Sequence, residues 1–412
     1  MRLLHTSDWH LGHTLRDWDR AAEHAAFLAW LLSVIDEERP DALLIAGDIF
    51  DSANPPASAQ EAWYDFLAAA RKRSADLEII VIGGNHDSPA RLDAPNPLLR
   101  AVRVHMVGGV PRTAERSLDL PRMLVPIRDA AGRRALVAAV PFLRPGDLPA
   151  VDAARGDPLI EGVRALYQQT FDHARTRLGD GDRLVAMGHL YLSGTQLSET
   201  SERPILGGNQ HALPVDLFPE DVAYVALGHL HRAQRAGGPL IRYAGSPIPL
   251  SMAEADYKHQ VVLVDLHATD TDPIRPLPVP RYVEIVRIPE RGAASLADVL
   301  PILRALPDKD TLPAARHPFL EVVITLDRPE PALHPQVQDA LVDRAARLVK
   351  VTRILTGTAA PLAEATQGRA LSDLSPEQVF LERYRREYSE PPTNELLAAF
   401  HELLASLSED GT

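Results

Sequence analysis

Five short apolar runs in this sequence each end in residues that can bind metal or transfer protons. The clearest is the β-branched run 79–82, which stops at two glycines and is followed at once by Asn85, His86 and Asp87. Such a run is typical of a buried strand, and in open α/β sheets ligands bind at the carboxyl ends of the strands. The repetition of this pattern therefore predicts an α/β fold in which several strand ends share one site.

The segments around these runs predict the connecting elements. Apolar residues at helical spacing indicate helices over about 19–38, 58–73 and 159–178. The alternation of strands and helices argues for stacked βαβ units, but two middle runs are typical of an antiparallel pair, so we expect mixed sheets. The expected strands cover residues 2–7, 42–46, 79–82, 123–127, 135–140, 184–187, 222–227 and 261–266, the last of which is expected to close the core.

A proline-bearing stretch at 272–280 predicts the first domain boundary. We expect a large domain over 1–275, a small α+β domain over 281–355 and, after a loose linker, an amphipathic helical pair over 376–407. The linker is expected at 356–375, and the small domain is expected to hold strands at 282–288 and 319–326 and helices at 297–306 and 335–349.

Composition limits the class of protein and the kind of site. No run of about 18 apolar residues and no signal-peptide core occur, so we expect a cytoplasmic protein with no membrane partner. The absence of cysteine excludes disulfides and thiolate-bound zinc, so a metal site must use His, Asp, Glu, Asn and backbone oxygens. The net charge of −13 leaves nucleic-acid binding open, because such binding needs only a local basic stripe or a basic partner.

Two pairs of residues at the strand ends have the spacing of metal ligands. Asp8 and His10 follow the first run, and His229 and His231 follow the last of the five. On an extended backbone, residues two apart point to the same face. Each pair is therefore expected to serve one metal cluster from one side.

Three more residues complete the set. Asp48 has two carboxylate oxygens and can bridge two cations, while Asn85 and His189 add an amide oxygen and an imidazole. With Asp48 counted twice, each of two cations has four ligands and keeps open positions for water and substrate. The sequence therefore predicts a centre that binds two divalent cations.

The charge of this centre indicates its substrate. Two divalent cations and two carboxylates leave about two positive charges, which a phosphodiester and a bridging hydroxide would neutralise. Two metals about 3.5–4 Å apart suit in-line attack on phosphorus. His86 is then the candidate acid for the leaving oxygen, and Asp87 is expected to orient or charge His86.

Single motifs of this kind also have ordinary structural explanations. Asp48, Asp51 and Asp87 taken alone are each compatible with a turn cap, and the role of Asp51 stays open. Coincidence is a poor explanation for five such motifs, each at the end of an apolar strand. We assign structural or surface roles to the remaining histidines: His5, His13, His24, His105, His173, His211, His259, His267, His317, His334 and His401.

The order D-x-H, G-D-x-x-D, G-N-H-D, G-H and G-H-x-H resembles that of the calcineurin-like metallophosphoesterases. More narrowly, residues 198–204, 224–231 and 243–247 resemble the SbcD nuclease subunits of bacterial SbcCD complexes. The resemblance is dense over residues 1 to about 266 and weaker beyond. It implies a two-sheet α/β sandwich with helices outside, followed by a small capping domain that contacts DNA.

The resemblance also implies an activity and partners. It implies a manganese-dependent nuclease that cuts DNA ends, hairpins and single strands in repair, in complex with an SbcC-like ATPase bound by the C-terminal helical pair. A homodimer within a heterotetramer is expected through helices near 58–73 and 95–102, although their apolar residues are equally compatible with a core. The implied ligands are Asp8, His10, Asp48 and His231 for one metal and Asp48, Asn85, His189 and His229 for the other.

Two alternatives remain open from the sequence. A small-molecule phosphodiesterase or nucleotide phosphatase of the same superfamily would use the same centre, but would not obviously need residues 281–412. A scaffold that kept the fold and lost catalysis is disfavoured by the complete ligand set.

Overall fold

The computed structural model describes residues 1–151, 156–196, 212–268, 273–327 and 330–355, and a few single positions beyond residue 379. Two compact units are present. One comprises Met1–Thr325 and Glu330–Ile354, and the other comprises Leu326–Pro329 and Leu355–Thr412. In the second unit the rings of Phe380 and Phe400 stack with their centroids 4.2 Å apart. The predicted linker at 356–375 and most of the predicted helical pair lie outside the described residues.

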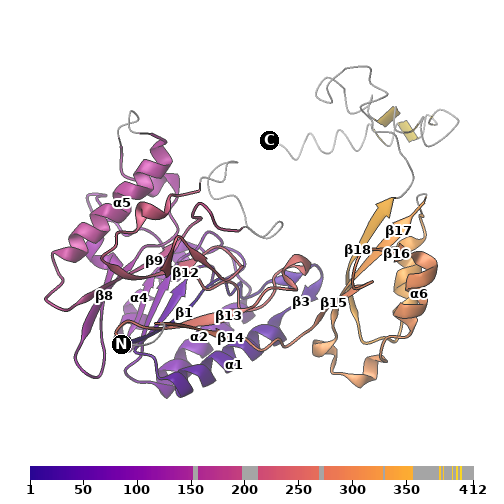
Figure 1. Ribbon diagram of the computed structural model, residues 1–412, viewed down its shortest axis with the longest axis horizontal. Coiled ribbons are helices and arrows are strands. Elements are labelled where there is room, and N and C mark those ends of the chain that lie inside the picture. The colour runs from indigo at the N-terminus through magenta and orange to yellow at the C-terminus, as the bar shows by residue number, and fades with distance from the viewer. Residues whose placement is uncertain are drawn as a thin grey trace. The chain divides into compact units, whose positions relative to one another are not determined.

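Two six-stranded mixed sheets form the body of the first unit (Figure 1). The first has the order β14-β13-β1-β4-β5-β6 and consists of β1 (Arg2–Thr6), β4 (Ala42–Ala46), β5 (Glu78–Ile82), β6 (Val104–Val107), β13 (Gln260–Asp265) and β14 (Ile274–Pro278). The second has the order β11-β12-β10-β9-β8-β7 and consists of β7 (Leu124–Arg128), β8 (Arg134–Ala139), β9 (Arg183–His189), β10 (Val222–Gly228), β11 (Gln234–Ala236) and β12 (Gly238–Tyr243). Within the first sheet, β1, β4, β5 and β6 run parallel, and within the second, β8, β9, β10 and β12 do.

Helices cover the outer faces of both sheets. They are α1 (Ala21–Glu38), α2 (Ala57–Arg73), α3 (Pro89–Asp93), α4 (Asn96–Leu99) and α5 (Pro158–Arg175). Alternate strand residues point to opposite faces: Leu44 of β4 belongs to the buried cluster between the sheets, whereas Leu43 belongs to the cluster that includes α1 and α2. Helix α5 lies beside the second sheet (Figure 1). Its Phe171 belongs to the buried cluster on the outer face of this sheet. The predicted two-sheet sandwich flanked by helices is confirmed.

A smaller α/β part follows the sandwich. It contains β15 (Ile285–Ile288), β16 (Ala294–Ser295), α6 (Leu296–Arg304), β17 (Phe319–Leu326), α7 (Leu333–Ala340) and β18 (Arg347–Leu355). A short hairpin of β2 (Thr14–Leu15) and β3 (Trp18–Asp19) follows β1. Among the residues that the structure describes, no helix has the length and apolar character needed to cross a bilayer.

Two predictions of elements were wrong. The helix predicted at 335–349 ends at Ala340, and residues 347–355 form β18, which pairs with β17. Buried Val349 lies between partly exposed Leu348 and exposed Lys350, the alternation of a strand with one covered face.

The run 261–266 is not the last strand of the body, because β14 continues the sheet to Pro278. Pro276 and Pro278 suggested a linker, but prolines are tolerated on an edge strand, where the missing N–H faces no neighbour. The sheet thus extends three residues beyond the expected boundary at 275.

Candidate metal centre

The predicted ligands lie just beyond the carboxyl ends of β1, β4, β5, β9 and β10, or at the last residue of one of these strands. An extended backbone was expected there from the spacing, but the backbone is left-handed. The angle φ is 54° at Asp8, 47° at His10, 50° at Asp48 and 97° at His229. Left-handed conformations are uncommon for residues with side chains and cluster at functional sites. The turns, rather than strand periodicity, bring each D-x-H or H-x-H pair to the same side.

The glycines of the motifs are required by close packing at the centre. A Cβ at Gly228 would lie 1.9 Å from the carbonyl oxygen of Ala46 on the opposite sheet, and a Cβ at Gly84 would lie 2.2 Å from Oδ1 of Asp48. Only glycine allows such approaches. The two sheets therefore come close enough for ligands from both to share one centre.

Asp48 lies at the middle of the cluster and is almost fully buried. Its Oδ2 is 3.2 Å from Nε2 of His189 and 3.7 Å from Nε2 of His10. Its Oδ1 accepts a hydrogen bond from the backbone N–H of His86 over 2.8 Å. Because Oδ1 is engaged by the backbone, Oδ2 is the oxygen that faces the imidazoles of both ligand sets.

The residues predicted to hold the first cation converge beside Asp48. Asp8, His10 and His231 each offer a ligand atom, and these atoms lie within 4.8 Å of one another. Nε2 of His10 is buried and has no hydrogen-bond partner among the described residues. Since buried polar atoms are nearly always paired, this orphaned nitrogen fits a site for a cation.

Asn85 lies beside the two imidazoles predicted to hold the second cation. Its Oδ1 lies 2.9 Å from Nε2 of His189 and 3.1 Å from Nδ1 of His229. Asp8, Asp48 and His189 also offer ligand atoms within 4.8 Å of one another. Oxygen and imidazole donors without sulfur are a combination that divalent transition metals accept.

Burial and mutual charge control protonation in the metal-free centre. Burial favours the neutral form of Asp48, but His189 and His10 hold the pKa of that carboxyl below its usual range. Burial likewise opposes the charging of His189, but the Asp48 carboxylate raises the pKa of this imidazole to about 9. For His229, burial lowers the pKa well below its ordinary value. A cation entering beside His189 must therefore displace a proton.

His86 lies at the rim of the cluster. Its Nδ1 is 2.8 Å from the backbone carbonyl oxygen of Asp51, and its ring centroid is 4.7 Å from that of His10. His86 also offers a ligand atom within 4.8 Å of those of His10 and Asp48. The position is compatible with proton transfer or with metal binding, so the sequence interpretation as an acid stays a prediction.

Asp51, whose role the sequence left open, contacts two site histidines. Its backbone carbonyl faces His86, and its carboxylate Oδ1 lies 3.2 Å from Nδ1 of His10. A carboxylate behind the outer nitrogen of a ligating imidazole fixes the ring and its tautomer. Asp51 therefore holds the site in place rather than only capping a turn.

The expected role of Asp87, to orient or charge His86, stays a prediction. Its buried carboxylate accepts hydrogen bonds from the backbone N–H groups of Gly84 at 2.9 Å, Phe50 at 3.0 Å and Ile49 at 3.2 Å. Burial and the nearby charge of Asp48 raise the pKa of Asp87 to about 6. These contacts tie the loops after β4 and β5 together, which makes Asp87 a positioning residue.

Glu254 is a site residue that the sequence did not reveal. Its side chain is fully buried, and its Oε1 lies 3.0 Å from Nδ1 of His231. Glu254 follows no apolar strand and belongs to no motif, so only the folded chain shows this contact.

Two histidines outside the motifs, His5 and His24, take the structural roles expected of them. Each is buried and hydrogen-bonded to a backbone carbonyl oxygen.

The fold and the centre define a class of protein that comparison with known families identifies. A model of the calcineurin-like phosphoesterases matches residues 1–233, and the chain belongs to that family. A second model, described as the type 5 capsule protein repressor C-terminal domain, matches residues 281–388.

Within this family, the chain is similar to proteins named as the SbcD subunits of SbcCD nucleases. The protein from Rhodobacter capsulatus is 42% identical over 387 residues, covering 92% of this chain and 93% of that protein. The Escherichia coli K12 protein is 31% identical over 394 residues, covering 94% and 93%. The Bacillus subtilis protein is 37% identical over 269 residues, covering 64% and 66%. The resemblance predicted from the motifs is therefore confirmed.

Proposed function

We propose that this chain is a metal-dependent DNA nuclease that hydrolyses phosphodiesters at double-strand ends, hairpins and single strands. The observation that carries the proposal is the convergence of ligands from both sheets around Oδ2 of Asp48. The proposed ligands are Asp8, His10, Asp48 and His231 for one cation, and Asp48, Asn85, His189 and His229 for the other. The similarity to subunits named as nucleases supports DNA as the substrate.

The residues of the chain have separate tasks in this reaction. When bound, two divalent cations supply an activated water and offset the charge that develops on the phosphoryl oxygens. Asp48 holds the two ligand sets together, and the Asp51 carbonyl accepts from Nδ1 of His86. This contact orients the ring so that Nε2 holds and releases the proton for the leaving oxygen. Asp87 keeps the two loops that carry Asp48 and His86 in register.

We propose manganese as the metal. Each ligand set combines carboxylate or amide oxygens with imidazoles, and the chain contains no cysteine. Carboxylate and carbonyl oxygens suit Mn²⁺, and the absence of thiolates removes one class of ligand that favours zinc and copper.

We propose an SbcC-like ATPase as the partner, because the relatives are named as one component of a complex. The domain layout that we propose is nuclease 1–278, with the boundary moved from 275 to the end of β14, DNA-contacting cap 281–355 and partner-binding segment 376–407. A chain truncated after about residue 370 should keep its metals and nick single-stranded DNA. It should no longer co-purify with the ATPase, and a tight complex formed by the truncated chain would contradict this assignment.

We also propose a homodimer, which with two ATPase copies gives a heterotetramer. The two segments predicted at the dimer interface contain both exposed and buried apolar residues. Leu98 is 78% exposed and lies close in sequence to Val102, which is 45% exposed, and Tyr64 of α2 is 41% exposed. The other large apolar residues of these two segments, Trp63, Phe66, Leu67 and Leu99, are buried in the core. Only the exposed apolar residues support the dimer.

The test is a parallel digestion. The purified chain, with Mn²⁺, Mg²⁺ or chelator, is incubated with an end-labelled DNA hairpin and with a cyclic dinucleotide. We expect manganese-dependent cleavage of the hairpin and little turnover of the dinucleotide. The reverse preference would favour the small-molecule phosphodiesterase, and no cleavage by the metal-loaded chain would favour a scaffold. We also propose a cytoplasmic location, in which the chain contacts the nucleoid when it acts on DNA.

A further inference from the structure

The carboxylate of Glu254 lies directly behind a proposed metal ligand. Its Oε1 is 3.0 Å from Nδ1 of His231, and both side chains are almost completely excluded from solvent. When Nδ1 of His231 carries the proton and donates a hydrogen bond to this carboxylate, the lone pair of the ring lies on Nε2. That tautomer is the one in which Nε2 can bind a cation.

Glu254 is itself held rigidly. Its Oε2 accepts a hydrogen bond from the backbone N–H of Leu250 over 2.9 Å, and it ends the short 3₁₀ turn Met252–Glu254. The loop that leads to Glu254 also holds the backbone of His231, because the N–H of Ser246 donates to the carbonyl oxygen of His231 over 3.0 Å. One loop therefore fixes both the backbone and the ring of His231.

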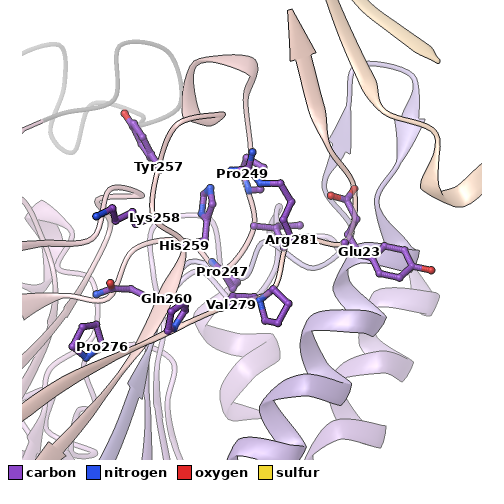
Figure 2. Close-up of a pocket in the computed structure, with 14 residues that line it drawn as sticks. Glu23, Pro247, Pro249, Tyr257, Lys258, His259, Gln260, Pro276, Val279 and Arg281 are labelled. Atoms are coloured by element: carbon purple, nitrogen blue, oxygen red, sulfur yellow. The ribbon is translucent and has the colours of Figure 1, made fainter. Parts of the chain in front are cut away.

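The outer side of this loop is fixed as well. Nδ1 of His259 lies 2.8 Å from the carbonyl oxygen of Ser246, and its Nε2 lies 3.4 Å from that of Glu254. His259 lines a cavity of about 320 Å³ together with Pro247, Pro249 and Tyr257, and Figure 2 shows these side chains around it. Glu254 does not line this cavity. A substitution of the Glu254 side chain therefore changes its contacts with His231 and Leu250 and leaves the lining of the cavity intact.

The two ligand sets differ in what lies behind their imidazoles. In the first set, His231 is backed by Glu254 and His10 by Asp51. In the second set, Nδ1 of His189 faces the backbone carbonyl oxygen of Ala46 at 2.9 Å. A carboxylate makes the imidazole a stronger ligand than a neutral carbonyl does, and such outer partners change metal affinity by about 10–100-fold.

We propose that Glu254 is a positioning residue that orients His231 and makes the first set, Asp8, His10, Asp48 and His231, the tighter of two unequal metal sites. This inference rests on the proposed metal centre. It predicts that the cations load in sequence as the metal concentration rises, with the set backed by carboxylates filled first.

The experiment compares Glu254→Gln and Glu254→Ala with wild type and with Glu23→Gln. Glu23 is the control for the loss of a buried carboxylate near this loop, because it lines the cavity and pairs with Arg20 instead of a proposed ligand. Mn²⁺ binding is measured by calorimetric titration of the full-length chain. Electron paramagnetic resonance counts isolated and coupled Mn²⁺ ions, and circular dichroism checks the fold.

We expect wild type and Glu23→Gln to bind two ions in two separable steps. Glu254→Ala should weaken the tighter step by about 10–100-fold and leave the weaker step nearly unchanged, so that the two steps merge. Glu254→Gln, which keeps a hydrogen-bond acceptor but loses the charge, should show a smaller loss and remains informative if the alanine variant does not fold.

Unchanged affinities and an unchanged resonance spectrum in folded Glu254→Gln and Glu254→Ala would overturn the inference while leaving the metal centre intact. Equal losses in Glu23→Gln would overturn it as well, because the effect would then follow from losing any buried carboxylate. Failure of wild type to bind metal at all would instead overturn the proposed function and this inference together.

Discussion

The backbone N–H of His86 donates to Oδ1 of Asp48 over 2.8 Å. The residue proposed to protonate the leaving group is therefore attached through its own backbone to the carboxylate proposed to bridge the metals. Because this bond engages Oδ1, it directs Oδ2 toward His10 and His189. Any movement of the loop after β5 changes the bridging ligand and the acid together.

Replacing the bridge should empty the centre. In Asp48→Asn the amide oxygen can still accept from the N–H of His86, so the fold should persist, but the negative charge shared by both ligand sets is lost. We expect elemental analysis to find fewer than two bound ions per chain and hydrolysis to be abolished. An active variant that still carries two ions would disprove the assignment of Asp48.

Removing His86 should separate chemistry from binding. If its ring transfers a proton and is no ligand, His86→Ala should bind metal and DNA normally and lose about 10²–10⁴ in rate. The control is His105→Ala, which removes a histidine of β6 that pairs with Glu78. If His86→Ala loses metal together with activity, His86 is a ligand instead of the acid.

Metal binding should release protons. The pKa of His189 is raised to about 9 in the metal-free centre, so this imidazole is charged at neutral pH and must lose its proton to bind a cation. The apparent affinity of that site should therefore fall as pH drops below about 9, by up to about tenfold per unit. Calorimetry at pH 7 in buffers of different ionisation enthalpy measures the protons released. Identical heats in all buffers would contradict the prediction.

A side chain at Gly228 should push the two sheets apart. The Cβ in Gly228→Ala would lie 1.9 Å from the Ala46 carbonyl oxygen, and overpacking of this kind costs about 1–3 kcal/mol or more. We expect a lower urea midpoint and loss of metal. The matched control is Gly238→Ala in β12, where an added Cβ meets no atom within 4 Å. Equal stability of the two variants would refute the close-packing argument.

A charge at Leu98 should weaken the dimer. Leu98 is the most exposed of the large apolar residues in the described part of the proposed interface, so Leu98→Glu should raise the dimer dissociation constant by about tenfold or more. Sedimentation velocity measures the shift. The control is Val342→Glu, which places the same charge at an apolar residue that is 61% exposed after α7. A dimer equally strong in both variants would place the interface elsewhere.

The sequence by itself determined most strands of the two large sheets and the residues at their ends, but not β6, β11 and β12. A buried strand is recognisable from a few neighbouring side chains, because backbone geometry sets its periodicity. The parallel strands β1, β4 and β5 and the ligands after them were therefore predictable. The same local reasoning failed for β18, where mixed composition over 335–349 resembled a helix, and for β14, where prolines resembled a linker.

Only the tertiary structure decided which residues support the centre. Asp51, Asp87 and Glu254 contact atoms that the chain brings near through turns and through the approach of two sheets. No local pattern encodes these contacts, since Glu254 is 23 residues from His231, and Asp87 contacts a loop 37–38 residues away. The left-handed turns at Asp8 and His229 are likewise maintained by the packing around them. The chemical type of each side chain is visible in the sequence, but the geometry of a site built from several side chains depends on long-range packing.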